Sequence, residues 1–83
     1  MAKILYFARL AEILGTKSDT IDVQDCATVA DLVTQLRSRG EPYASAFDGD
    51  TRVLVAINQE MSEPDSKISN MDEIAFFPPV TGG

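Results

Sequence analysis

The sequence contains no histidine and no tryptophan, and it has a single cysteine, Cys26. Without histidine, the chain lacks the side chain that most often acts as a general base near neutral pH and most often binds transition metals. A single cysteine excludes a disulfide within the chain and a cysteine-rich metal site. We therefore expect no metal centre, no bound cofactor, and a location in the reducing cytoplasm.

Basic residues and long apolar runs are also scarce. Seven lysines and arginines stand against 13 aspartates and glutamates, which gives a formal net charge of -6. Because phosphate binding needs clustered basic residues, a nucleic-acid partner is not expected. The acidity either suits a partner with a basic docking face or only keeps a small protein dissolved. No apolar run is long enough for a transmembrane helix and no secretory signal pattern is present, so membrane association is not expected.

The length of 83 residues leaves room for one small domain. A chain of this size buries only about 60% of the surface that its unfolded form exposes, so its stability should be modest. It has no second lobe with which to form a deep interdomain cleft. A self-contained enzyme is therefore not expected. The size of the chain does not exclude a role as one subunit of a larger enzyme complex.

Short apolar and β-branched runs predict a set of strands. The expected strands are residues 3–8, 20–23 and 52–57, a short return strand at Met61, and residues 74–77. A short helix ending at Gly15 should follow the first strand, and Asn58-Gln59 should form a turn. Pro78 and Pro79 should close the last strand, because proline has no N–H to donate to a sheet.

One principal helix is expected after Thr28. Thr28 is a suitable N-cap with Asp31 three residues later, and Gly40 stands where a left-handed C-terminal cap belongs. The apolar face of this helix comprises Val29, Leu32, Val33 and Leu36. Segregated strands and one main helix indicate the α+β class. We expect a β-grasp domain over residues 1–78, with a mixed sheet packed on the helix as in ubiquitin.

The sequence ends in a segment with little side-chain bulk, residues 79–83, which closes with Gly82-Gly83. We expect a flexible tail, because a backbone without Cβ atoms can enter a tunnel that rejects other residues. Five extended residues reach about 16 Å, far enough to enter the active site of another protein. Two glycines at a given pair of positions occur by chance about 0.5% of the time, so the ending alone is suggestive and an ordinary frayed terminus remains an alternative.

Several longer segments together resemble one known family. The segments are KILYFA (residues 3–8), EILG (12–15), VAINQ (55–59) and DEIAFFPPVTGG (72–83). They are similar, at matching spacing over essentially the whole chain, to the molybdopterin synthase small subunits of the MoaD/ThiS family of ubiquitin-like sulfur carriers. The sequence departs from the family at Asn70-Met71-Asp72, where a Gly-Asp turn is common. Since Asn tolerates a left-handed backbone, only the local turn type is in doubt.

This resemblance implies a function for the tail. In the family, a ubiquitin-activating-type adenylyltransferase consumes ATP to adenylate the terminal carboxylate, here that of Gly83, and sulfur then replaces AMP to give a thiocarboxylate. Val80, Thr81 and Gly82 would thread into the large synthase subunit, where the sulfur passes to cyclic pyranopterin monophosphate to build the molybdopterin dithiolene. A carboxylate needs such activation because it is a poor electrophile. The chain would then be a sulfur-donating subunit that is inactive alone.

Strand parity suggests where partners dock. Ile4, Tyr6, Ile74 and Phe76 should be core residues, because alternate residues of a strand share one face. Phe7 and Phe77, with Met61 nearby, should then form an exposed apolar patch on the face of the sheet away from the helix. The alternative is that all of these residues are core. The resemblance also places Phe7, Met61 and Phe77 at the interface with the large subunit.

Cys26, Arg37 and Arg39 are further candidates for a chemical role. Cys26 lacks a histidine that could activate it, so a small structural cysteine is favoured over a sulfur donor. Arg37 and Arg39 are interpreted as solvated charges at the end of the principal helix rather than as a phosphate site.

Other functions remain open from the sequence. A sulfur carrier for the thiazole of thiamine or for tRNA thiolation would share the fold and the Gly-Gly ending. A ubiquitin-like modifier that forms isopeptide bonds with lysines is a different class, and a passive interaction domain with an incidental tail is another. The run FFPPVT, residues 76–81, favours the molybdopterin pathway.

Overall fold

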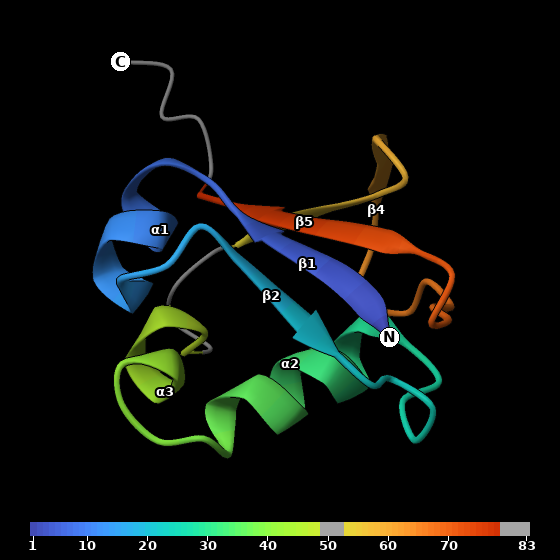
Figure 1. Ribbon diagram of the computed structural model, residues 1–83, viewed down its shortest axis with the longest axis horizontal. Coiled ribbons are helices and arrows are strands. Elements are labelled where there is room, and N and C mark those ends of the chain that lie inside the picture. Colours follow the sequence, from blue (N-terminus) through green and yellow to red (C-terminus); the bar gives the residue numbers. More distant parts are fainter. Residues whose placement is uncertain (49–52, 79–83) are drawn as a thin grey trace.

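Five strands form a single sheet in the computed structural model, which describes residues 1–48 and 53–78. The strands are β1 (Ala2–Tyr6), β2 (Ser18–Ile21), β3 (Leu54–Ile57), β4 (Glu60–Ser62) and β5 (Glu73–Phe77). Their spatial order is β2-β1-β5-β3-β4 (Figure 1). The central pair β1 and β5 is parallel, and the other neighbours are antiparallel. The sheet is therefore mixed, as predicted.

Within residues 1–48 and 53–78, three helices accompany the sheet: α1 (Ala8–Leu14), α2 (Val29–Arg37) and α3 (Tyr43–Ala46). Figure 1 shows α2 and α3 on the same side of the sheet, whereas α1 lies at the end of β1. The principal helix is α2, and its Val29, Leu32 and Leu36 are buried. The α+β class and the β-grasp arrangement are confirmed. Among the described residues, no helix has the length and apolar character needed to cross a membrane.

The predicted capping box fixes the start of α2. The Thr28 side chain accepts a hydrogen bond from the Asp31 N–H at 3.4 Å, and the Asp31 carboxylate accepts from the N–H groups of Ala27 and Thr28 at 2.9 and 3.1 Å. These bonds occupy backbone donors that a helix leaves free at its start. They also lower the pKa of Asp31, because backbone N–H groups favour the ionised carboxylate.

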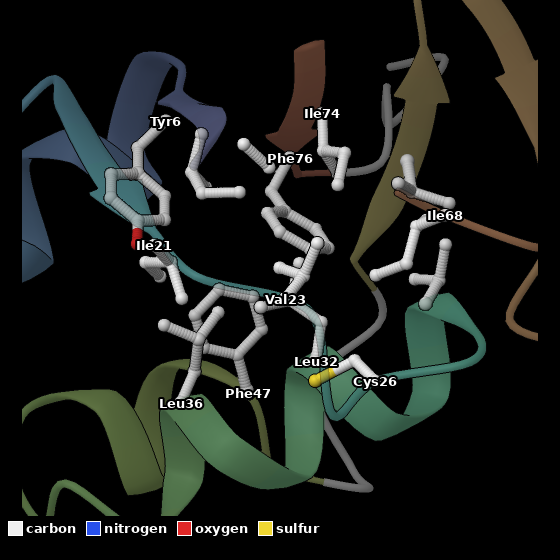
Figure 2. Close-up of a cluster of buried hydrophobic side chains, with 14 of the residues drawn as sticks. Tyr6, Ile21, Val23, Cys26, Leu32, Leu36, Phe47, Ile68, Ile74 and Phe76 are labelled. Atoms are coloured by element: carbon white, nitrogen blue, oxygen red, sulfur yellow. The ribbon is translucent and has the colours of Figure 1, made fainter. Parts of the chain in front are cut away.

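The core lies between the sheet and α2 and α3. Figure 2 shows side chains from strands, helices and loops meeting there, including Tyr6, Phe47 and Phe76. The rings of Phe47 and Phe76 lie 5.1 Å apart, edge to face, and Tyr6 stacks on Phe76 at 6.4 Å. Ile4 and Ile74 are fully buried, and Tyr6 and Phe76 are at most 2% exposed, so the predicted core assignment is confirmed.

The strand boundaries differ from the prediction, most of all in the first two strands. The first strand ends at Tyr6 rather than at residue 8, because Ala8 already begins α1. The second strand pairs through Ser18–Ile21 rather than through residues 20–23. Val23 is buried, but its N–H donates to the Asn70 side chain at 2.8 Å and so lies outside the ladder. An apolar pattern marks burial and cannot by itself show which backbone groups pair.

Turn geometry confirms some predictions and corrects others. Gly15 caps α1 with a left-handed φ of 73° as expected, whereas the C-cap of α2 is Ser38 and the left-handed Gly40 follows two residues later. Asn70 was expected to tolerate a left-handed backbone, but it does not adopt one; in the described part of the chain the non-glycine residues with positive φ are Ala8, Asn58 and Gln59. The Asn70 side chain binds Val23 and Asp22. It therefore acts through side-chain hydrogen bonds rather than through its backbone.

Candidate functional site

The face of the sheet opposite α2 carries a continuous row of small and apolar residues. Leu5 of β1 lies opposite Ala75 of β5, Ala75 lies opposite Ala56 of β3, and Ala56 lies opposite Met61 of β4. Directly paired residues share a face of a sheet, and Leu5 faces away from its buried neighbours Ile4 and Tyr6. We call this surface the open face. Ala56 is 9% exposed yet lies outside the core cluster, which fits its position there.

A second apolar row on the open face lies nearer the end of β5. Phe77 lies opposite Leu54, and both side chains are half-buried. Phe7 follows β1 directly, keeps an extended backbone (φ -114°, ψ 154°) and donates its N–H to the Phe76 carbonyl at 3.0 Å. It thus continues the parallel pairing by one residue, which brings it beside Phe77. The structure therefore places Phe7 and Phe77 in one row, with Met61 in the next.

Exposure distinguishes these residues from the core. Phe7 is 48% exposed and Met61 is 64% exposed, whereas core side chains such as Phe76 are almost fully covered. In the described part of the chain, α2 and α3 pack against the other face (Figure 1). Large exposed apolar side chains gathered on one surface are typical of a protein interface. The predicted exposure of Phe7 and Met61 is confirmed, whereas Phe77 is half-buried rather than exposed. The role of all three residues in binding stays a prediction.

The open face continues into a groove beside α1. This groove has a volume of about 820 Å³, and its lining includes Leu5, Phe7, Lys3, Lys17 and Glu12. Two lysines against one glutamate make it locally basic in a chain whose net charge is -6. The net acidity of the chain therefore does not extend to this groove, because the charge of a small protein is unevenly distributed.

The described part of the chain ends next to this surface. β5 ends at Phe77, and the half-buried Pro78 is the last described residue. The predicted tail residues Val80, Thr81, Gly82 and Gly83 lie outside the described residues, as does Pro79. The second apolar row, which contains Phe77, and the last described residue thus lie at the same end of β5.

Cys26 has the features of a structural cysteine. It is 8% exposed, and its thiol donates to Gln35 Oε1 at 3.1 Å. Burial raises the pKa of the Cys26 thiol, and the nearby carboxylates Asp31, Asp25 and Asp22 raise it further. A thiol that resists ionisation is a weak nucleophile, so the favoured structural interpretation is supported.

Arg39 is more constrained than the sequence indicates. Its guanidinium donates to Asp19 Oδ2 of β2 at 2.6 Å and lies 5.0 Å from the centre of the Tyr43 ring. The hydrogen bond to Asp19 raises the pKa of Arg39. Arg39 is exposed, as its interpretation as a solvated charge implies, but it also joins the segment after α2 to the edge strand β2. Because Arg39 and Asp19 are 20 residues apart, no local sequence pattern predicts their contact.

No group of three or more potential metal-binding histidine, cysteine or acidic side chains is found within residues 1–48 and 53–78. The model of the ThiS family matches residues 4–83. The chain belongs to the ThiS family. The resemblance noted from the sequence is thereby confirmed.

Among curated proteins, this ThiS-family chain is 42% identical to the molybdopterin synthase sulfur carrier subunit of Haemophilus influenzae and 37% identical to that of Escherichia coli. Both alignments cover all of this chain and all of the relative. It is also 35% identical to small archaeal modifier protein 1 of Haloferax volcanii, over 93% of this chain and 94% of the relative.

Solved structures show the same fold. SAMP1 of Haloferax volcanii superposes with a TM-score of 0.75 at 28% identity, covering 99% of this ThiS-family chain and 98% of that protein. A protein–protein complex of subunits 1 and 2 of molybdopterin-converting factor from Helicobacter pylori contains a chain that superposes with a TM-score of 0.66 at 17% identity, covering 99% and 97%. The second match shows the fold alone.

Sequence reasoning missed part of this ThiS-family site. Leu54 and Ala56 belong to the open face, although the strand that contains them reads as almost continuously apolar. Strand parity applied to residues 54–57 would have separated them from the core residue Val55. Asn58 was predicted only as a turn residue, but its side chain also binds Asp72 and the Glu73 N–H. It thereby fixes the β3–β4 turn to the start of β5.

Proposed function

We propose that this chain is the sulfur carrier subunit of a molybdopterin synthase and that the carboxylate of Gly83 is its reacting group. The observation that supports this most strongly is the full-length similarity to bacterial relatives with that name, within the ThiS family. The proposal also accounts for a fold without histidine, with a buried and unreactive Cys26. The chain then contributes a tail and a docking surface rather than catalytic side chains, in the cytoplasm.

The chemistry of the tail follows from the inertness of a carboxylate. In the proposed cycle, an adenylyltransferase of the ubiquitin-activating type joins the Gly83 carboxylate to the α-phosphate of ATP and releases pyrophosphate. A sulfur donor then displaces AMP and leaves a thiocarboxylate, whose sulfur is the nucleophile in the transfer to cyclic pyranopterin monophosphate. ATP is consumed by the partner and needs no site on this chain. Val80, Thr81 and Gly82 would lie in the partner's tunnel.

The open face is the proposed docking surface for the large synthase subunit. Phe7, Met61 and Phe77 provide apolar side chains of the kind that anchor interfaces. They are positioned by rigid strands rather than by loops, so little ordering is needed when a partner binds. Because Pro78 follows Phe77 directly, docking here would bring the root of the tail to the partner's surface.

Removal of the terminal glycine tests this proposal. A chain lacking Gly83 should melt like the full-length protein, because the described core lies between residues 2 and 76. It should fail to form molybdopterin when mixed with the large subunit, the activating enzyme, ATP and a sulfur source. An alanine substitution at Lys67 serves as a surface control. Full activity of the truncated chain would refute the carrier role.

A protein-modifier function is the second candidate, because the chain is 35% identical to small archaeal modifier protein 1. A modifier forms an isopeptide bond between its terminal carboxylate and a lysine. Adducts that survive boiling under reducing conditions, and that disappear without Gly83, would favour this function. The other carrier functions, in the synthesis of the thiamine thiazole or in tRNA thiolation, are tested in the same sulfur-transfer assay. There the corresponding sulfur acceptor replaces cyclic pyranopterin monophosphate.

A further inference from the structure

Met61 combines high exposure with a position on the open face, at the end of the apolar row and on the edge strand β4. Its side chain is 64% exposed, and it lies opposite Ala56 in the row that crosses β4, β3, β5 and β1. Its neighbours in that row are alanines, which do not cover a long side chain. The thioether of Met61 is therefore accessible to small solutes while the protein is free of partners.

We propose that Met61 is an oxidation site through which a peroxide weakens docking of the open face to the large synthase subunit, an inference that rests on the proposed function. Methionine is soft and apolar and fits well into an interface. Its sulfoxide is polar and has a new stereocentre, which disrupts interfaces that use methionine. A strong acceptor oxygen within this apolar surface would have to be desolvated when the partner binds.

The reaction is a two-electron oxygen transfer. The O–O bond of hydrogen peroxide breaks, one oxygen forms the S–O bond of the sulfoxide, and the other leaves as water. Sulfur is oxidised and the peroxide is reduced, so no other reactant is needed. Methionine sulfoxide reductases reverse the change, which makes it suitable for regulation.

The same chain contains an internal control. Met71 is 91% exposed, so it should be oxidised at least as readily as Met61. It precedes the start of β5 and lies six residues from Phe77, or about 20 Å along an extended strand. Its oxidation should therefore have no effect on docking. Cys26 should react slowly, because it is buried and its pKa is raised.

The test compares wild type, Met61→Leu and Met71→Leu before and after treatment with hydrogen peroxide. Peptide mass mapping measures the sulfoxide at each methionine, thermal melting checks the fold, and calorimetric titration measures binding to the large subunit. Peroxide should weaken binding of wild type and of Met71→Leu by about fivefold or more. In Met61→Leu, whatever its own affinity, treatment should leave binding unchanged. Sulfoxide reductase should restore the wild type.

The outcomes separate this inference from the proposed function. Untreated wild type that does not bind the large subunit would overturn both. Wild type that binds equally well when Met61 is fully converted to sulfoxide would overturn the oxidation site alone. The inference also fails if Met61 stays reduced while Met71 is oxidised, or if treated Met61→Leu loses binding as wild type does.

Discussion

Phe76 and Phe77 are consecutive residues of β5 that face opposite sides of the sheet. Phe76 is 1% exposed and packs edge to face on Phe47 at 5.1 Å. Phe77 is half-buried on the open face, opposite Leu54. This alternation gives two similar side chains different tasks: one supports the fold, and the other is available to a partner.

Alanine substitutions should separate these tasks. Phe76→Ala should lower the free energy of unfolding by about 3–5 kcal/mol, because it leaves a cavity in a small core. Phe77→Ala should lower it much less, but should weaken binding to the large subunit by about 2 kcal/mol or more if Phe77 is an anchor. Chemical denaturation and calorimetric titration measure the two effects. A Phe77→Ala variant that unfolds, beside an intact Phe76→Ala variant, would show that the faces are inverted.

Tyr6→Phe should keep or increase stability. The Tyr6 hydroxyl is buried and has no hydrogen-bond partner within the part of the chain that the structure describes. Burial raises the pKa of Tyr6, so the hydroxyl stays neutral and contributes only its cost of desolvation. Removing it should raise the free energy of unfolding by about 1 kcal/mol in denaturant titrations. If Tyr6→Phe instead lowered the free energy of unfolding by a similar amount, the hydroxyl would have a hydrogen-bond partner, such as a buried water.

Ala8→Gly should be neutral or stabilising, against the usual effect of glycine in a helix. Ala8 begins α1 with φ at 53°, in the left-handed region that costs a non-glycine residue about 1–2 kcal/mol. Glycine adopts this angle without that cost, although it loses more entropy on folding. Ala11→Gly in the same helix is the matched control and should destabilise by about 1 kcal/mol. Equal losses at both positions in thermal melts would contradict the assigned angle.

The capping box predicts a pH-dependent difference in stability. Because backbone N–H groups lower the pKa of Asp31 below its ordinary 3.8, its ionised form stabilises the folded state. That contribution is complete above the ordinary pKa and is lost as the pH falls through the folded value. Wild type should therefore exceed Asp31→Asn in stability at neutral pH, and the gap should close in acid.

Thr28→Ala is the companion variant, because it removes a cap that does not titrate. It should lower stability by about 1 kcal/mol, largely independently of pH. Denaturation series between neutral and acidic pH compare the three proteins. A gap between wild type and Asp31→Asn that widens in acid would contradict the assigned role of Asp31.

Much of the fold could be predicted because local signals determine it. Thr28 and Asp31 mark the start of α2, and strand parity separates Tyr6 from Phe7. The features that escaped prediction depend on contacts between distant residues. The Arg39–Asp19 ion pair spans 20 residues, and the Asn70–Val23 hydrogen bond spans 47. Such pairs form only once the sheet brings their elements together.

The candidate site likewise has parts that the sequence could predict and parts that it could not. Phe7 and Phe77 could be assigned to the open face, because alternation along a strand is a local property. Met61 was placed near them without that argument. The groove beside α1 could not, because Lys3 and Lys17 lie on different segments that meet only in the folded chain. The role of Gly83 was inferred from resemblance and from backbone chemistry, since no side chain there could indicate it.

The most direct test is mass spectrometry of the protein isolated from its own cells. A Gly83 thiocarboxylate adds about 16 Da, close to the mass added by methionine oxidation, so the shift must be assigned to a peptide. Cleavage after Glu73 releases residues 74–83, which contain no methionine. The account predicts the shift in that peptide and its loss when Gly83 is deleted. An unmodified peptide from cells that are making molybdopterin, or a persulfide on Cys26 in its place, would contradict it.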